Sequence, residues 1–195
     1  NAKPVGITDG AKIWELLQHP GNTKYAYSVL RHSAQTLLAP QEYDLKDFIM
    51  PIAEDVRGSF AESIQIFQGL VFIFDGQIET AKKHFQFLLD KTDNPMSQTL
   101  SQLYLLQIAL LERDHEKAEE YASNRGVKSF LSLKMADTQI MQAWYQFLVK
   151  KDRDQTDKAI KIARKNMVTS RLVRDEKRYY ENWLAELEKE LSEGV

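Results

Sequence analysis

Apolar residues recur along most of the chain at intervals of three and four, which is the spacing of one face of an α-helix. No segment shows the alternation of apolar and polar residues between turn signals that indicates a β-strand. The pattern therefore predicts an all-α protein with about nine or ten helices. The expected helices cover roughly residues 10–18, 23–38, 41–56 (with a kink or two short helices around Pro51), 59–74, 77–90, 96–112, 115–122, 137–150, 154–166 and 170–191.

Turn and capping residues separate these helices. Ser59 is expected to cap its helix, with Glu62 three residues later completing a capping box. Asp75-Gly76 is expected to end that helix, and Asn124-Arg125-Gly126 to end the helix over 115–122. Short polar turns place consecutive helices side by side in antiparallel pairs. Two helices have a well-marked apolar stripe: Ala26, Val29, Leu30, Ala34, Leu37 and Leu38 in one, and Val173, Tyr180, Leu184, Leu187 and Leu191 in the last.

One helix pair carries an ordered set of small and aromatic residues. The set is Gly69, Phe72, Gly76, Ala81 and Phe85, followed by Pro95. Over Glu62 to Pro95 this pattern resembles a tetratricopeptide repeat, in which small residues allow the two helices to approach closely and aromatic residues fill the space between pairs. Two weaker copies follow: Leu105, Ala109, Asp114, Ala118 and Ala122, then Trp144, Phe147 and Ala159. A generic antiparallel helical bundle is the alternative.

The resemblance implies a right-handed α-solenoid of stacked helix pairs. On this interpretation residues 3–55 form an N-terminal helical segment packed on the repeats, residues 56–167 form degenerate repeat hairpins, and residues 168–195 form a long capping helix, all in one structural domain. The chain opens Asn-Ala-Lys-Pro without an initiator Met. We interpret this opening as the remnant of a cleaved tag, on either a domain cut from a longer protein or a mature form whose leader has been removed.

Composition narrows the classes of function. The 195 residues are 43% hydrophobic and 28% charged, which excludes a disordered chain. There is no Cys, which excludes disulfide scaffolds, cysteine nucleophiles and thiolate metal sites. The net charge of −2 gives no general signal for nucleic acid. No apolar run approaches the roughly 20 residues of a membrane span. The expected location is the cytoplasm, although a chain without Cys also suits the bacterial periplasm.

The sequence offers no pattern typical of catalysis. No two of the four histidines lie at the spacing of metal ligands on a helix. Asp152, Asp154 and Asp157 resemble a calcium loop only superficially, because the Gly and the closing Glu are missing, so they are expected to form a polar turn with a capping Asp. No phosphate loop or nucleophile elbow occurs. We therefore expect a protein that is not an enzyme and that uses no cofactor and no metal.

Two surfaces are candidates for binding a partner. The resemblance implies that the inner faces of the first helices of each pair bind a peptide. The residues expected there are Phe67, Leu70, Phe74, Tyr104, Gln107 and Tyr145. In the alternative, residues 1–55 fold against this groove and fill it.

The second candidate surface is basic. Between Lys150 and Arg178 the chain has eleven basic and five acidic residues. The residues that share helical faces are Lys158, Lys161, Lys165, Arg171, Arg174 and Arg178. This patch suits an acidic peptide or a phosphate backbone, or else it is a solvated outer face. Because no aromatic residues are interleaved with it, nucleic acid is not the expected partner.

The function predicted on this basis is that of a protein- or peptide-interaction module of the tetratricopeptide type, which binds a partner segment in a concave helical groove. One alternative is an oligomerisation or structural domain that uses the apolar helix over 59–74 or the terminal helix as a self-interface, giving a homodimer. The other is the peptide-sensing regulatory half of a larger transcription regulator.

Overall fold

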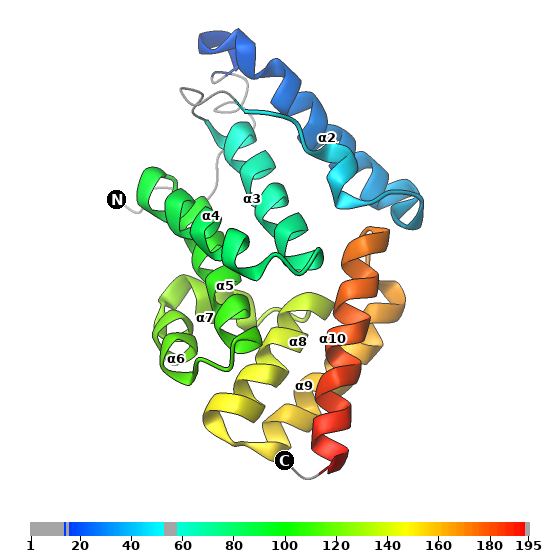
Figure 1. The fold of residues 1–195 in the computed structure, drawn as a ribbon. Coiled ribbons are helices and arrows are strands. Elements are labelled where there is room, and N and C mark those ends of the chain that lie inside the picture. Colours follow the sequence, from blue (N-terminus) through cyan, green and yellow to red (C-terminus); the bar gives the residue numbers. More distant parts are fainter. Residues whose placement is uncertain (1–13, 15, 53–57, 194–195) are drawn as a thin grey trace, which may run out of the picture.

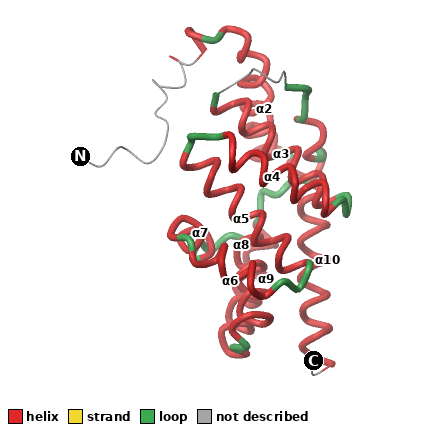
Figure 2. The backbone as a smooth tube through the Cα atoms, turned by 60° about the vertical axis from the view of Figure 1, so that its left-hand side comes forward, coloured by secondary structure: helices red, strands yellow, loops and turns green. Residues whose placement is uncertain are grey.

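The computed structural model describes residues 14, 16–52 and 58–193. Every regular element in that part of the chain is helical, so the protein is all-α (Figure 2). The α-helices are α2 (Thr23–Leu38), α3 (Ser59–Phe74), α4 (Ile78–Lys91), α5 (Pro95–Leu111), α6 (His115–Ser123), α7 (Arg125–Leu131), α8 (Ala136–Tyr145), α9 (Arg153–Thr169) and α10 (Arg174–Glu193). Short 3₁₀ turns lie at Pro20–Asn22 (η1), Pro40–Glu42 (η2) and Leu45–Phe48 (η3), and a π-turn (η4) covers Gln146–Lys150.

The helices follow one another in space much as they do in sequence (Figure 1). α2 packs on α3, α3 on α4, α4 on α5, α5 on both α6 and α7, and α8 on α9. The C-terminal helix α10 departs from this order, because it runs alongside α8 and α9 and also reaches α3, η2 and η3. The last helix therefore contacts both the first and the last parts of the described chain.

Most of the expected helices are present with nearly the expected bounds, and α2 and α3 match them at both ends. Two expected helix bounds are wrong. Over residues 40–52 the chain forms two 3₁₀ turns rather than the expected helix, and the rest of the stretch expected after Pro51 lies outside the described residues. The last helix begins at Arg174 rather than Ser170. Asn124 ends α6 as expected, and its side chain also caps an additional helix, α7, that was not predicted. Most of the helix expected over 10–18 lies outside the described residues.

The turn and the close approach expected within the best repeat copy are both present. Gly76 adopts a positive φ of 73° in the turn between α3 and α4, a conformation that favours glycine. A Cβ added to Gly69 would lie 2.3 Å from Cζ of Phe85, whose ring is fully buried. Gly69 therefore provides the space that the Phe85 ring occupies between α3 and α4.

The start of α3 differs from the expected capping box. Gly58 is the N-cap, and Ser59 is the first helical residue. The Glu62 carboxylate accepts hydrogen bonds from the Thr92 hydroxyl at 2.7 Å, from the Asn94 amide at 2.9 Å and from the Ser97 hydroxyl. Glu62 therefore joins α3 to the connection between α4 and α5, a long-range role that local spacing does not indicate.

The N-terminal segment and the start of α10 are bonded to each other across about two thirds of the chain. Both carboxylate oxygens of Asp175 accept the backbone N–H of Leu45 at 3.0 Å, and the Arg174 backbone N–H donates to the Tyr43 carbonyl at 2.9 Å. The Arg174 guanidinium also pairs with the Asp44 carboxylate. These bonds hold η3 against α10. The N-terminal segment and the C-terminal helix are therefore parts of one folded unit.

Candidate functional site

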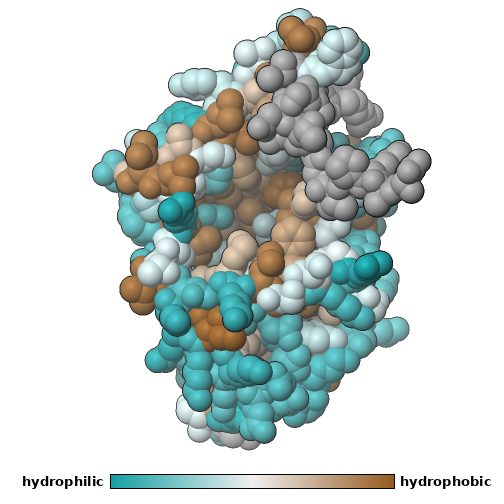
Figure 3. Space-filling view, turned by 180° about the vertical axis from the view of Figure 1, so that it is seen from behind, coloured by the Kyte–Doolittle hydropathy of each residue, from teal (hydrophilic) through white to brown (hydrophobic). Residues whose placement is uncertain are grey.

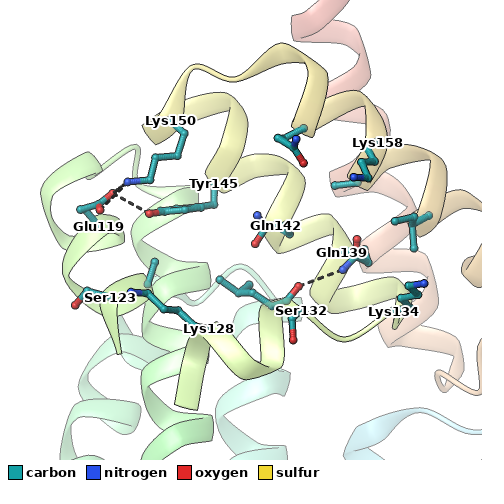
Figure 4. Close-up of a pocket in the computed structure, with 15 residues that line it drawn as sticks. Glu119, Ser123, Lys128, Ser132, Lys134, Gln139, Gln142, Tyr145, Lys150 and Lys158 are labelled. Atoms are coloured by element: carbon teal, nitrogen blue, oxygen red, sulfur yellow. Dashed lines mark hydrogen bonds and ion pairs between the residues drawn. The ribbon is translucent and has the colours of Figure 1, made fainter. Parts of the chain in front are cut away.

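A cleft of about 620 Å³ opens between α6, α7, α8 and α9 (Figure 4). Polar and charged side chains make up most of its rim, and small apolar side chains form its floor. Its lining residues are Glu119, Ala122, Ser123, Lys128, Leu131, Ser132, Lys134, Gln139, Gln142, Tyr145, Lys150, Gln155, Lys158, Ala159 and Ile162. The volume lies within the range typical of ligand-binding clefts.

The cleft is positively charged. Four lysines line it against one glutamate, which gives the lining a net charge of +3 although the whole chain carries −2. Lys128 comes from α7, Lys134 from the α7–α8 connection, Lys150 from the π-turn and Lys158 from α9, and all four are exposed. Four separate elements thus direct ammonium groups to one opening, where their potentials add.

The single carboxylate of the lining is held at one end of the cleft. Glu119 accepts the Lys150 ammonium at 2.7 and 2.8 Å and the Tyr145 hydroxyl at 2.8 Å (Figure 4). The hydrogen bond from Lys150, and then that from Tyr145, lower the pKa of the Glu119 carboxyl. Glu119 therefore stays ionised and neutralises Lys150. Lys128, Lys134 and Lys158 form no ion pair among the described residues.

Local hydrogen bonds fix the segments that carry these lysines. The Asn124 side chain accepts the N–H groups of Gly126 at 2.8 Å and Val127 at 3.3 Å, which starts α7 in the direction that places Lys128 at the cleft. The Gln139 amide donates to the carbonyls of Leu131 at 3.1 Å and Leu133 at 2.7 Å. These bonds secure the short connection that carries Lys134.

The other side of the cleft depends on the way α8 ends. Its last turn widens into the π-turn, and Lys151 then adopts a left-handed conformation with a φ of 54°. Asp152 follows and caps α9 by accepting the Gln155 N–H at 3.0 Å. A π-turn is often found at functional sites. Here it places Lys150 opposite Glu119 and begins α9 so that Lys158 faces the opening.

The floor of the cleft is apolar. Ala122, Leu131 and Ala159 are buried there, and Ile162 is half-buried. Gln139 and Gln142 project between the floor and the rim (Figure 4). A ligand with both apolar and anionic groups would therefore find a partner for each kind of group.

The lining offers little for catalysis. Its one carboxylate is ionised and bonded to a lysine and a tyrosine, so it accepts hydrogen bonds and has no proton to donate. In the described part of the chain, no group of three or more His, Asp or Glu side chains is arranged to hold a metal ion. His32 and His84 lie away from the cleft, and burial lowers the pKa of both. The lining thus supplies ammonium donors and one carboxylate acceptor that is already bonded.

The residues expected to form a peptide groove are divided between different environments. Gln107 is fully buried, and its amide bonds the Tyr179 hydroxyl at 3.4 Å and the Tyr180 hydroxyl at 3.3 Å. Leu70 is also buried. Both were expected to contact a partner, and both are inaccessible. Core side chains cover Leu70, and helix α10 covers Gln107.

The aromatic members of that expected groove are partly covered by the chain itself. Phe67 packs on His32 of α2 with ring centroids 4.6 Å apart, and Phe74 packs on Tyr179 of α10 at 4.9 Å. Tyr104 is half-buried beside Phe85. The face opposite the view of Figure 1 is hollowed at its centre, and the surface within the hollow is largely apolar (Figure 3). Of the expected groove residues, Tyr145 alone lines the lysine cleft.

The expected basic patch is also divided. Lys158 lines the cleft, whereas Lys161, Lys165, Arg171 and Arg178 are exposed outside it. Arg174 is paired with Asp44 and so joins two parts of the fold. Arg164, from the same basic stretch, forms a two-point pair with Glu188 of α10. Two arginines of the basic stretch therefore form ion pairs within the protein and do not present their full charge to a partner.

The sequence did not indicate Lys128 or Lys134 as site residues. Both lie in and after α7, a helix that the sequence analysis did not predict. The available signal was Asn124, which is a strong N-cap residue and was interpreted as a helix end. The packing of α7 on α8 and of α8 on α9 brings these lysines to Lys158, and spacing along the chain does not reveal it.

No protein-family model matches this chain, and no curated protein or solved structure matches it. Within the described residues, no helix is both long enough and apolar enough to cross a membrane.

Proposed function

We propose that this chain is a non-catalytic protein-interaction module that binds an acidic segment of a partner protein in the lysine cleft. The observation that carries the proposal is the convergence of four lysines from four elements on one apolar-floored opening. An acidic segment supplies carboxylates for the ammonium groups, and its apolar side chains reach the floor. Charge complementarity of this kind raises the association rate and excludes basic competitors.

Contacts at the Glu119 end of the cleft support a carboxylate ligand in particular. Lys150 and Tyr145 together hold the Glu119 carboxylate at 2.7–2.8 Å, which is the geometry of charge-assisted hydrogen bonds. Lys128, Lys134 and Lys158 present the same type of donor without an internal acid. A partner segment therefore meets three ammonium groups without an ion-pair partner among the described residues, beside Lys150, which is already paired with Glu119.

The proposed type of module is a degenerate tetratricopeptide-like stack of helix pairs. Its support is the packing of α3 on α4, α5 on α6 and α8 on α9, and the close approach of Gly69 and Phe85 within the first of these pairs. Relative to the groove expected from the family resemblance, the proposed binding site lies instead between α6, α7, α8 and α9. Helix α10 and the N-terminal segment cover part of the expected groove.

Charge reversal within the cleft tests the proposal. The probe is a short fluorescent peptide in which glutamate alternates with leucine, and binding is measured by fluorescence anisotropy. We expect Lys128→Glu with Lys158→Glu to weaken binding at least about tenfold, because two attractive contacts become repulsive. We also expect the affinity of the unmodified protein to fall as salt is added.

The matched control is Lys83→Glu with Lys165→Glu. These lysines are exposed on α4 and α9 outside the cleft, and the substitutions change the net charge by the same amount. The control should bind the probe within about twofold of the unmodified protein. Equal losses in the two double variants would contradict the proposal, because they would mean that binding responds only to net charge. Failure of the unmodified protein to bind the probe would also contradict it.

A further inference from the structure

Helix α2 has two apolar faces, and the described part of the chain covers only one of them. Tyr25, Ala26 and Ser28 of α2 are buried against the rest of the protein. On the opposite side, Tyr27 is 68% exposed, Leu30 62% and Leu37 59%. An apolar stripe of this kind on the solvent side of a surface helix marks an interaction site when it is contiguous.

The exposed residues have the spacing of a helix–helix seam. Tyr27, Leu30, Ala34 and Leu37 follow each other at intervals of three, four and three, which is the spacing of the core positions of a coiled coil. We call these four residues the α2 seam. Leu38 lies beside the seam and is 85% exposed. The apolar stripe that the sequence indicated on this helix is thus buried at Ala26 and exposed at Leu30, Leu37 and Leu38.

The orientation of α2 is fixed by specific contacts on its buried side. The Ser28 hydroxyl donates to the Phe48 carbonyl, and the His32 ring packs on Phe48 at 4.7 Å and on Phe67 at 4.6 Å. Rotation of the helix to bury the seam would break these contacts. The seam is therefore a stable feature of the surface.

We propose that the α2 seam binds the α2 seam of a second copy of this chain in an antiparallel, two-fold symmetric pair. In this register Leu30 faces Ala34 of the second copy, and Tyr27 faces its Leu37. A large side chain meets a small one near the axis, which allows close packing. The same four residues of each copy therefore form both sides of the interface.

The charges beside the seam favour the same occupant. Helix α2 carries Lys24 and Arg31 and has no acidic residue, while Glu42 is exposed just beyond its C-terminal end. In an antiparallel pair, Lys24 of one copy lies near the end of the other copy's α2, where it meets Glu42 and the negative end of the helix dipole. Arg31 is directed toward the Phe48 ring, with its guanidinium carbon 5.4 Å from the ring centroid, and so is drawn away from the axis.

The size of the surface is sufficient for a weak dimer. Four large apolar side chains that each expose more than half of their surface form a patch on the order of several hundred Å². Two such patches with their flanking residues approach the roughly 1,200 Å² at the lower end of stable interfaces. The α2 seam exposes more apolar surface than the self-interfaces expected from the sequence on α3 and α10, whose apolar residues are buried or half-buried within the chain.

Light-scattering mass across a concentration series tests the pairing. We expect the mass of the whole chain to rise from 22.6 kDa toward twice that value as concentration increases. In Leu30→Asp with Leu37→Asp the dimer should weaken at least about a hundredfold. The control Phe87→Asp with Val168→Asp changes residues that are 55% and 82% exposed on other helices, and it should dimerise like the unmodified protein.

Three results would overturn the proposal: a constant mass of 22.6 kDa in the unmodified protein, a dimer that survives in the α2 variant, and an equal loss in the control. A constant mass would leave the seam to a different partner. The register has its own test, because the chain contains no Cys. A mixture of Leu30→Cys and Ala34→Cys proteins should form the mixed disulfide in preference to either homodisulfide, and the reverse preference would overturn the antiparallel register.

Discussion

Truncation of Trp144 to alanine should lower the free energy of unfolding by about 3–5 kcal/mol, the range for a large aromatic side chain in a core. Trp144 is 1% exposed and stacks on Trp183 of α10 with ring centroids 5.8 Å apart. Its indole N–H donates to the Trp183 carbonyl at 3.2 Å. The variant therefore loses core volume and leaves the buried Trp183 carbonyl without this donor.

The guanidinium of Arg113 is a second link between Trp144 and α10, and the Trp144→Ala substitution should weaken it. It lies 4.4 Å from the centroid of the Trp144 ring and also pairs with Glu186 and Glu190 of α10. Loss of the ring removes the surface that orients Arg113 toward α10. Trp144 thus joins the helix-pair region to the C-terminal helix, and α10 is an integral part of the folded unit.

Urea unfolding followed by circular dichroism measures the loss. The matched control is Trp14→Ala, because Trp14 is 61% exposed and the same atoms are removed. We expect that control to change the free energy of unfolding by about 0.5 kcal/mol or less. A Trp144→Ala loss as small as that of Trp14→Ala would show that α10 does not depend on the packing seen at Trp183.

The stability of the protein should fall as pH rises from about 4.5 to 8, in part because of Glu176. Burial, and then the nearby Asp137 and Asp175 carboxylates, raise the pKa of the Glu176 carboxyl to about 8, against an ordinary value of 4.5, while its hydrogen bond from the Val173 N–H acts in the other direction. Between these two pKa values the folded state binds a proton that the unfolded state has lost. The free energy of unfolding then decreases with pH, by at most about 1.4 kcal/mol per pH unit from this group.

Glu176→Gln should remove that contribution. The amide keeps the shape of the protonated carboxyl and an oxygen that can accept the Val173 N–H. Relative to the unmodified protein, the variant should gain stability progressively from pH 5 to pH 8, as measured by urea unfolding at a series of pH values. The control is Glu181→Gln, five residues later and exposed, which should leave the pH profile unchanged. A parallel pH profile for Glu176→Gln would contradict the account of this buried acid.

The buried face of a helix was predictable from the sequence where the helix has only one apolar face. The apolar stripe expected for the last helix is buried at Val173, Tyr180 and Leu187, because the opposite face of α10 is strongly charged. In α2 the sequence has two apolar faces, and periodicity alone does not reveal which one the chain covers. The choice depends on Phe48 and Phe67, which approach from elsewhere in the chain.

The candidate site was less predictable than the fold. Lys158 and Tyr145 were recognised, but the sequence analysis assigned them to two different surfaces, because nothing in their spacing places α6, α8 and α9 around one opening. Glu62 shows the same difficulty. Its spacing from Ser59 predicted a local cap, whereas Thr92, Asn94 and Ser97 bind it after the chain has turned twice. Long-range hydrogen bonds decide such roles.

The most direct test of the central claim is to map where the acidic probe peptide contacts the protein. Amide chemical shifts of the isotope-labelled protein would be measured by NMR during titration with the glutamate–leucine peptide. The account predicts saturable shifts grouped around Lys128, Lys134, Lys150 and Lys158, and none of comparable size with a peptide in which glutamine replaces glutamate. Shifts confined to Phe74, Tyr104 and Tyr179, or the same response to both peptides, would contradict it.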